Sequence, residues 1–299
     1  MSLPRALLVS LRPHQWTKNL VVLAALAFSK HLFDPDAALR AAAALAAFCA
    51  LSGAVYVVND LADAERDRLH PLKRKRPIAS GALGIATARA FAGLLLLGGL
   101  AVAWRLGGGF LICVLGYLVL NLAYTFGLKD VVILDVLAIA IGFVFRAVSG
   151  ALAIRVVFSD WLLVCTILLA LFLALAKRRH ELVMLGDAAG HRRALAEYSP
   201  YLLDQMIAVV TASCLTAYAF YTLAPETIEK YRTDRLAFTI PFVIYGIFRY
   251  LYLVHRKEQG GSPGDLLLAD RPLLLAVAAW AVAVVVIVYT APGVPVPRG

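Results

Sequence analysis

The stretch at residues 39–67, LRAAAALAAFCALSGAVYVVNDLADAERD, decides the fold. Residues 39–62 are almost all apolar, and about 20 such residues are enough for a helix to cross the hydrocarbon core of a bilayer. An asparagine and several carboxylates stand at the end of this run. The stretch therefore predicts a membrane-spanning helix with a polar cluster where it leaves the membrane.

The rest of the 299-residue chain has the same apolar character. Hydrophobic residues make up 62% of it and charged residues only 16%, with a mean hydropathy of +0.80; a typical soluble domain has about 25% charged residues. A soluble protein cannot hide so much apolar surface. This excludes a cytosolic enzyme, a secreted domain and a disordered chain, and it predicts an all-α polytopic membrane protein with a single domain over residues 1–299.

Nine apolar runs are long enough, or nearly so, to span the membrane. They are rich in Leu, Ala and Val and lack the two-residue alternation of a transmembrane β-barrel. The four cysteines stand singly inside such runs, which predicts neither a disulfide nor a zinc site. The predicted spans are residues 20–34, 39–62, 86–104, 109–127, 131–154, 160–177, 203–224, 236–254 and 271–290.

The distribution of positive charge predicts how the chain is oriented. Connections on the side of the N terminus carry 20 of the 29 Lys and Arg residues, and those on the other side carry 8. Basic loops stay in the cytoplasm, so we expect a cytoplasmic N terminus and an outer, flexible tail at residues 291–299. Topology thus explains the net charge of +10 without a nucleic-acid partner. The two connections densest in charge, 62–85 and 177–202, follow the second and sixth spans, which suggests two four-helix halves.

The polar cluster after the second span has the composition of a magnesium site. Carboxylates this close repel each other unless a cation lies between them, and Mg²⁺ prefers hard oxygen ligands. The alternative is an ordinary solvated helix end, but ionisable groups that continue an apolar span are costly without a role. We expect Mg²⁺, or Mn²⁺, to be bound by four side chains that share one face of a helix with 3.6 residues per turn: Asn59, Asp60, Asp63 and Asp67.

Two basic stretches accompany this cluster. Residues 70–77, HPLKRKRP, follow it directly, and residues 177–181, KRRHE, open the loop after the sixth span. Lys and Arg are natural ligands for phosphate oxygens, so metal and phosphate ligands together indicate a site for a metal-bound diphosphate. The alternative is a pair of anchors for anionic lipid headgroups. The expected phosphate ligands are Lys73, Arg76, Lys177 and Arg178.

Other polar residues are weaker candidates for the same site. Lys18 lies in an amphipathic segment that we expect at the membrane surface. Tyr124 and Lys129 end the fourth span. Asp135 and Arg146 lie in the fifth span about three turns apart, too far to pair directly. Each therefore needs another partner, and both are candidates for lining a polar cavity.

The motif NDxxDxxxD after the second of nine spans resembles the UbiA superfamily of intramembrane prenyltransferases. Within it, the chain resembles the decaprenyl-phosphate phosphoribosyltransferases of cell-wall arabinan (arabinogalactan) synthesis. Aromatic prenyltransferases of the superfamily carry a second acidic motif, DxxxD, after the sixth span, whereas here that place reads KRRHE and keeps only the final acid. The strings that carry the resemblance are RPHQWTKN, NDLADAERDRLHPLKRKRP, YTFGLKD, GFVFRAVSGA and KRRHE.

The resemblance implies a nine-helix UbiA-like bundle around a cavity that opens to the cytoplasm and to lipid. It implies a Mg²⁺-dependent transferase of a bacterial inner membrane that moves the 5-phosphoribosyl group from phosphoribosyl pyrophosphate to polyprenyl (decaprenyl) phosphate and releases pyrophosphate. Asp60, Asp63 and Asp67 would be catalytic through the metal, and Glu181 and Asp135 would orient ribose hydroxyls. A homo-oligomer is compatible with the sequence.

Two alternatives remain open at this point. The first is prenyl transfer from a polyprenyl diphosphate to an aromatic acceptor, which predicts the second acidic motif. The other is a lipid or solute transporter, which predicts charge along the membrane midplane and on both faces. The dense clusters are on the cytoplasmic side and only Arg146 lies deep, which favours the phosphoribosyltransferase.

Overall fold

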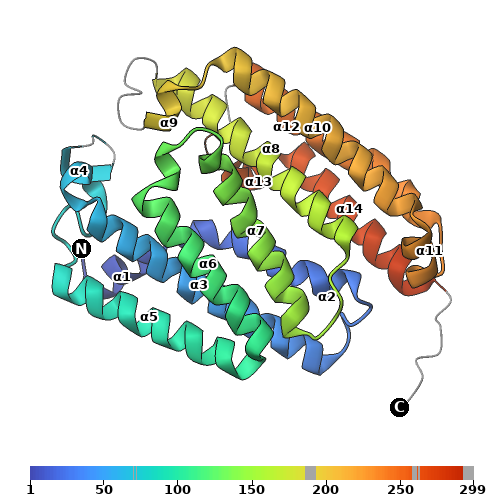
Figure 1. The fold of residues 1–299 in the computed structure, drawn as a ribbon, viewed down its shortest axis with the longest axis horizontal. Coiled ribbons are helices and arrows are strands. Elements are labelled where there is room, and N and C mark those ends of the chain that lie inside the picture. Colours follow the sequence, from blue (N-terminus) through green and yellow to red (C-terminus); the bar gives the residue numbers. More distant parts are fainter. Residues whose placement is uncertain (70, 72, 186–192, 258–260, 262, 292–299) are drawn as a thin grey trace. The chain divides into compact units, whose positions relative to one another are not determined.

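The computed structural model describes residues 1–69, 71, 73–185, 193–257, 261 and 263–291. These residues form helices and connecting turns, with no strand among them, which confirms the all-α prediction (Figure 1). Most of the tail predicted to be flexible, residues 292–299, lies outside the described residues, as do His70 and residues 186–192 of the two charged connections.

The described part of the chain contains eight helices that are long and apolar enough to cross a membrane. Their bounds agree with the second to ninth predicted spans to within a few residues, except that the sixth helix continues well past residue 177. The helices are α3 (Pro35–Ala62), α5 (Ile85–Leu106), α6 (Gly108–Phe126), α7 (Leu134–Ala153), α8 (Asp160–Leu185), α10 (Pro200–Leu223), η5 (Arg235–Thr239) continued by α12 (Ile240–Arg256), and α14 (Arg271–Thr290).

The first predicted span, residues 20–34, does not form one long helix. Its residues complete a 3₁₀-helix, η1 (Pro13–Leu23), and then form the short α2 (Ala24–Phe28). A ninth spanning helix is therefore not confirmed. The remaining short elements are α1 (Leu3–Leu11), α4 (Ala64–Leu69), η2 (Lys73–Lys75), η3 (Leu128–Asp130), α9 (Arg193–Ala196), α11 (Pro225–Tyr231) and α13 (Pro263–Ala269).

Side-chain caps fix the starts of three long helices. Asp34 accepts hydrogen bonds from the backbone N–H groups of residues 36 and 37 at the start of α3. Ser199 does the same for α10, and Asp270 for α14, each through the N–H group three residues on. Such caps satisfy donors that have no partner inside the helix. Gly107, with φ +127°, separates α5 from α6 by a single residue.

Contacts within the chain group it into two compact units. The first comprises Met1–Leu26, Leu32–Leu128 and Phe145–Val157, and the second comprises Ala27–His31, Lys129–Val144 and Phe158–Gly299. Helix α7 contributes its first half to the second unit and its second half to the first.

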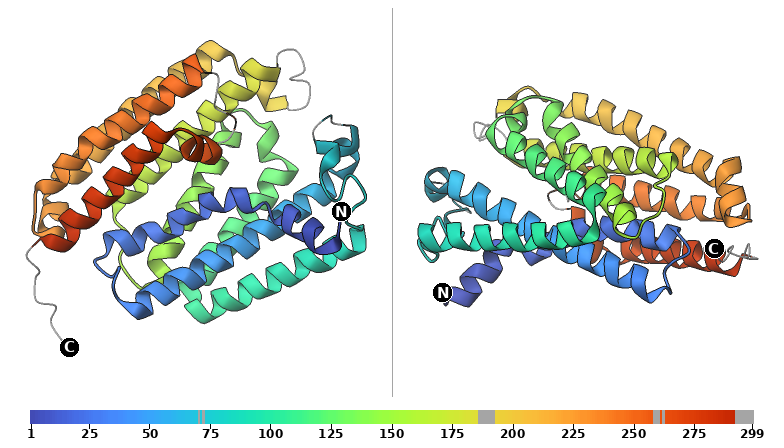
Figure 2. Two further views of the ribbon diagram at one scale, coloured as in Figure 1. Left: turned by 180° about the vertical axis from the view of Figure 1, so that it is seen from behind. Right: turned by 60° about the horizontal axis from the view of Figure 1, so that its bottom comes forward.

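In the first unit, α3 is the central helix. It packs against α5, against η1 and against α1, and α5 packs against α6 (Figures 1 and 2). Small residues allow the closest approach: a Cβ on Gly99 of α5 would lie 2.6 Å from Cγ of Leu51 on α3. Aromatic rings fill the space between α3 and α6, where Phe48 meets Phe110 and Tyr117 edge-on.

In the second unit, α8 packs against α10, and α12 packs against α14 (Figure 2). The core of this unit contains Phe172 and Tyr250, whose rings meet edge-on at 5.3 Å. A second, aromatic core surrounds Tyr231, whose hydroxyl donates to the carbonyl of Phe28 at 2.7 Å. Each unit thus has its own buried core on which its polar residues are placed.

Candidate functional site

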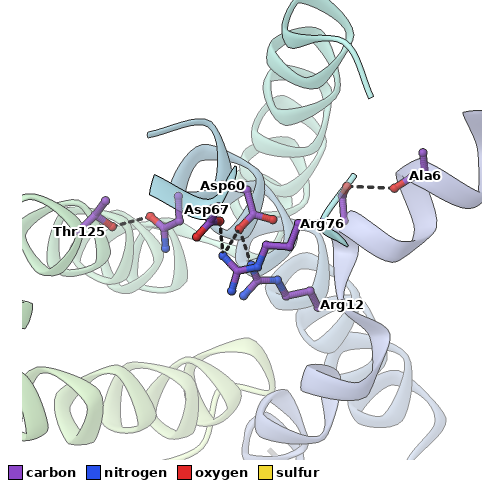
Figure 3. A network of polar contacts seen from close by, with 8 residues as sticks. Ala6, Arg12, Asp60, Asp67, Arg76 and Thr125 are labelled. Atoms are coloured by element: carbon purple, nitrogen blue, oxygen red, sulfur yellow. Dashed lines mark hydrogen bonds and ion pairs between the residues drawn. The ribbon is translucent and has the colours of Figure 1, made fainter. Parts of the chain in front are cut away.

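The carboxylates at the end of α3 and on α4 are held by two arginines. Asp60, in the last turn of α3, is only 3% exposed and pairs with Arg12 and Arg76. Nη1 of Arg76 lies 3.0 Å from Oδ1 of Asp60 and 2.7 Å from Oδ2 of Asp67, which is also buried (Figure 3). The structure therefore brings together two predicted metal ligands and one predicted phosphate ligand, and it adds Arg12.

The four expected ligands do not lie on one uninterrupted helix. Helix α3 ends at Ala62, and Asp63 has backbone angles of −95° and 5°, outside the regular helix. Aspartate favours such positions because its side chain competes for nearby backbone groups. Asn59 turns to α6 instead, where its Oδ1 accepts a hydrogen bond of 2.6 Å from the Thr125 hydroxyl. The four residues therefore do not share one uninterrupted helix, because α3 is interrupted at Asp63.

The donor set suits a hard divalent cation in its chemistry. Three carboxylates and a carboxamide lie between the last turns of α3 and the end of α4, and Mg²⁺ needs only one or two of them when waters and substrate oxygens complete its shell. Among the described residues, no three His, Cys, Asp or Glu side chains already converge as a metal cage. Arg12 and Arg76 instead provide the positive charge that the buried acids require.

Four further candidates lie on other elements of the two units. Lys73 is exposed on η2, which packs against α4. Tyr124 is half-buried in the last turn of α6, one residue before Thr125. Lys18 is half-buried on η1 in the first unit, and Lys129 is half-buried on η3 and belongs to the second unit. Each of these lysines and Tyr124 has an interaction with another part of the protein.

Arg146 is buried in the half of α7 that belongs to the first unit. Its Nε donates to Oδ1 of Asn19 at 2.8 Å, and its Nη2 donates to the hydroxyl of Tyr117 at 3.0 Å. The guanidinium also lies over the Tyr117 ring, 4.7 Å from its centre. Asn19 in turn donates to Ser52 of α3 at 3.1 Å. The deep arginine thus ties η1, α3, α6 and α7 together.

Asp135, Arg178, Glu181 and Lys177 form one network in the second unit. Asp135, fully buried in the first turn of α7, accepts a hydrogen bond of 2.6 Å from Nε of Arg178. Arg178 is only 2% exposed and its Nη1 lies 2.5 Å from Oε2 of Glu181. Lys177 lies 3.7 Å from the other oxygen of Glu181. The prediction that Asp135 and Arg146 need separate partners is confirmed.

Tyr198, which the sequence did not single out, completes this network. Its buried hydroxyl donates to Oδ1 of Asp135 at 2.8 Å and accepts from the N–H of Ile133 at 2.8 Å. Burial raises the pKa of Tyr198 to about 12, and the hydrogen bond to Asp135 acts in the same direction, while the Ile133 N–H opposes it. The phenol therefore remains a donor at neutral pH.

The site residues that the sequence did not predict are hydrogen-bond or ion-pair partners of the residues that it did predict. Arg12 lies in the quoted segment RPHQWTKN, where a cation before the first apolar run was a usable signal. Thr125, Tyr117 and Tyr198 gave no such signal, because single hydroxyl groups near span ends are common and only tertiary packing selects them.

Residues 19–263 match the UbiA prenyltransferase family, and the chain belongs to this family. It is 33% identical to the decaprenyl-phosphate phosphoribosyltransferase of Corynebacterium glutamicum over 97% of this chain and 89% of that protein. It is 32% identical to the enzyme of the same name from Mycobacterium tuberculosis over 91% of this chain and 90% of that protein. These similarities confirm the family predicted from the motifs.

The fold is shared with solved structures of this family. A UbiA homologue from Archaeoglobus fulgidus bound to GPP and Mg²⁺ superposes with a TM-score of 0.74, covering 95% of this chain and 99% of that one at 18% identity. The same homologue has also been solved bound to Cd²⁺, with a TM-score of 0.70. The chain is thus an integral membrane protein with the UbiA fold.

Proposed function

We propose that this protein transfers the 5-phosphoribosyl group from phosphoribosyl pyrophosphate to a polyprenyl phosphate, such as decaprenyl phosphate, and releases pyrophosphate. The names of relatives that align along almost the whole chain support this proposal. The reaction would take place on the cytoplasmic side of a bacterial inner membrane and supply a precursor of cell-wall arabinan.

The observation that carries the proposal is the network around Arg178. At the place of the second acidic motif, the chain has a buried arginine held between Asp135 and Glu181, with Lys177 beside it. Two positive and two negative groups balance each other, so this network has no excess of carboxylate charge for a second metal–diphosphate complex. It suits a sugar phosphate, which offers both hydroxyl groups and a phosphate.

In the first unit, the acidic network would bind the leaving group. Mg²⁺ held by Asp60, Asp63 and Asp67, with Asn59 close by, would neutralise the pyrophosphate as a Lewis acid. Arg76 and Lys73 would bind phosphate oxygens, Arg76 through its planar fork. Arg12 already donates to Asp60 and would act beside Arg76.

In the second unit, we assign substrate contacts to the partly exposed residues of the Arg178 network and positioning to the buried ones. Lys177 is 37% exposed and would contact a phosphate directly, whereas Arg178 is buried and would hold Glu181 in place. Glu181, 24% exposed, would accept hydrogen bonds from ribose hydroxyls, supported by Asp135. Lys18, Tyr124, Lys129 and Arg146 would contribute less directly, and Arg146 chiefly positions Asn19 and Tyr117.

The chemistry requires charge stabilisation rather than proton transfer. The lipid phosphate is already an anion near neutral pH, so it can attack the anomeric carbon without a strong general base. The barrier arises from bringing two anions together and from the charge that develops on the pyrophosphate. Positively charged side chains fixed in a site of low dielectric lower that barrier because they need not reorganise during the reaction.

A single assay tests the proposal. Purified protein is mixed with polyprenyl phosphate and phosphoribosyl pyrophosphate labelled in the ribose, with Mg²⁺ or with EDTA. We expect label to enter the organic phase only when the metal is present. Label that stays in water, while a parallel reaction supplied with a polyprenyl diphosphate and an aromatic acid consumes both, would instead identify an aromatic prenyltransferase.

A further inference from the structure

Tyr198 links the turn that precedes α7 to the charged end of α8. Its hydroxyl accepts from the N–H of Ile133 and donates to Asp135, which accepts from Arg178. Arg178 then pairs with Glu181. The Tyr198 hydroxyl thus connects the backbone of Ile133 to a series of charged side chains that ends at the partly exposed Glu181 and Lys177.

The backbone at Ile133, in the turn before α7, has a strained conformation. Ile133 has φ +70°, the left-handed region, which a β-branched residue adopts only rarely. Its side chain is exposed and so gains little from packing. The hydrogen bond from the N–H of Ile133 to Tyr198 holds the turn in this conformation. Helix α7 starts from the turn, and Asp135 in its first turn then faces Arg178.

The hydroxyl of Tyr198 donates its single hydrogen bond to Asp135. The hydroxyl has one hydrogen, and it is directed to a buried carboxylate 2.8 Å away. Asp135 has no exposed surface, and Arg178 has almost none, so neither can replace a lost hydrogen bond with one to solvent. Removing the hydroxyl would leave both the Ile133 N–H and one Asp135 oxygen without this partner.

We propose that Tyr198 is a positioning residue for the phosphoribosyl donor: it sets Asp135 and Arg178 so that Glu181 and Lys177 face the ribose phosphate. This inference rests on the proposed function and assigns a role within it to a residue outside the sequence motifs. In this role Tyr198 acts on the donor through Asp135 and the backbone at Ile133.

The test compares Tyr198→Phe with a matched control, Tyr201→Phe. Tyr201 is 75% exposed on α10, three residues away. We expect Tyr198→Phe to raise the KM for phosphoribosyl pyrophosphate about tenfold or more, since a buried carboxylate loses a hydrogen bond. The KM for polyprenyl phosphate should change less than about twofold, and Tyr201→Phe should match the wild type.

A double mutant separates positioning from general stability. If Tyr198 acts through Asp135, adding Tyr198→Phe to Asp135→Asn should raise the donor KM no further than Asp135→Asn alone. Fully multiplicative effects of the two changes would overturn the inference, as would a lower amount of active enzyme with both KM values unchanged. Tyr198→His, which keeps a hydrogen-bonding ring, should fall between phenylalanine and the wild type.

The outcomes also distinguish this inference from the proposed function. Wild-type protein that does not transfer phosphoribose refutes the function itself. Wild-type protein that does transfer it, with a Tyr198→Phe variant of unchanged donor KM, refutes only the positioning role. If neither Tyr198 variant folds while Tyr201→Phe does, the tyrosine is purely structural and the inference is wrong.

Discussion

Asp60 and Asp63 stand three residues apart in different surroundings. Asp60 is buried and paired with both Arg12 and Arg76, whereas Asp63 is only partly buried at the break between α3 and α4. We expect Asp63→Asn to lower kcat/KM at least about 100-fold with a smaller loss of melting temperature than Asp60→Asn, because it removes a metal ligand while both arginine pairs of Asp60 remain.

Asp60→Asn should lower both activity and stability. It leaves two guanidinium groups without their shared carboxylate, at a cost of about 1–3 kcal/mol since both arginines remain partly exposed to water. Thermal unfolding in detergent, followed beside the transfer assay, measures both effects. Equal losses of melting temperature in the two variants would contradict the distinction, and wild-type rates in either would remove the metal assignment.

At the residue scale, the sequence predicted charges better than their partners. Asp60, Asp67 and Arg76 were predictable because ionisable groups at a membrane surface are costly and therefore informative. Their mutual contacts were partly predictable, because residues 60, 67 and 76 are close together in the sequence. Thr125 bonds to Asn59, which is 66 positions away in the sequence, and Tyr198 bonds to Asp135, which is 63 positions away. No local sequence pattern encodes such pairings.

At the element scale, long apolar runs predicted the long helices because length and composition alone determine whether a helix can cross a bilayer. The same argument gave the wrong local structure for the first predicted span, residues 20–34, which ends η1 and then forms only the short α2. Asn19 of η1 bonds to α3 and to Arg146 of α7, and these tertiary contacts outweigh the local preference for an α-helix.

Close packing of η1 against α7 depends on Gly150. A Cβ at this position would overlap the carbonyl group of Val22, which is backbone and cannot rotate away. We expect Gly150→Ala to destabilise the protein by about 1–3 kcal/mol through this overlap. Gly98→Ala on α5 is the matched control, because a Cβ there meets nothing within 4 Å, and it should be neutral or slightly stabilising.

Thermal unfolding of the two glycine variants in the same detergent measures the difference. If Gly98→Ala and Gly150→Ala shift the melting temperature equally, the contact between η1 and α7 does not limit packing. An unchanged melting temperature for Gly150→Ala would lead to the same conclusion.

At the scale of the whole molecule, the number of membrane crossings depends on residues 13–28. Asn19 bonds to Ser52, which lies about 15 Å from the end of α3 at 1.5 Å per residue, near the middle of a membrane about 30 Å thick. Residues 20–28 then extend about 15 Å further, since a 3₁₀-helix rises about 2.0 Å per residue. A short, partly 3₁₀-helical segment is thus long enough to cross the membrane.

Asn19 is tolerated in this segment because it faces protein rather than lipid. Asn19 is buried against Ser52 and Arg146, which satisfies the groups that hydrocarbon cannot. We therefore predict nine crossings, with the N terminus in the cytoplasm and the C terminus outside, although only eight described helices are long. An even number of crossings would put both termini on one side.

Reporter fusions in a bacterial host measure this directly. Alkaline phosphatase, which is active only outside the cytoplasm, should be active when fused after Gly299, and green fluorescent protein at the same place should be dark. Fusions after Lys257, which follows α12, should give the reverse because the chain has then crossed once less. A fluorescent fusion at Gly299 together with a dark one at Lys257 would show that the segment at residues 13–28 turns back within the membrane.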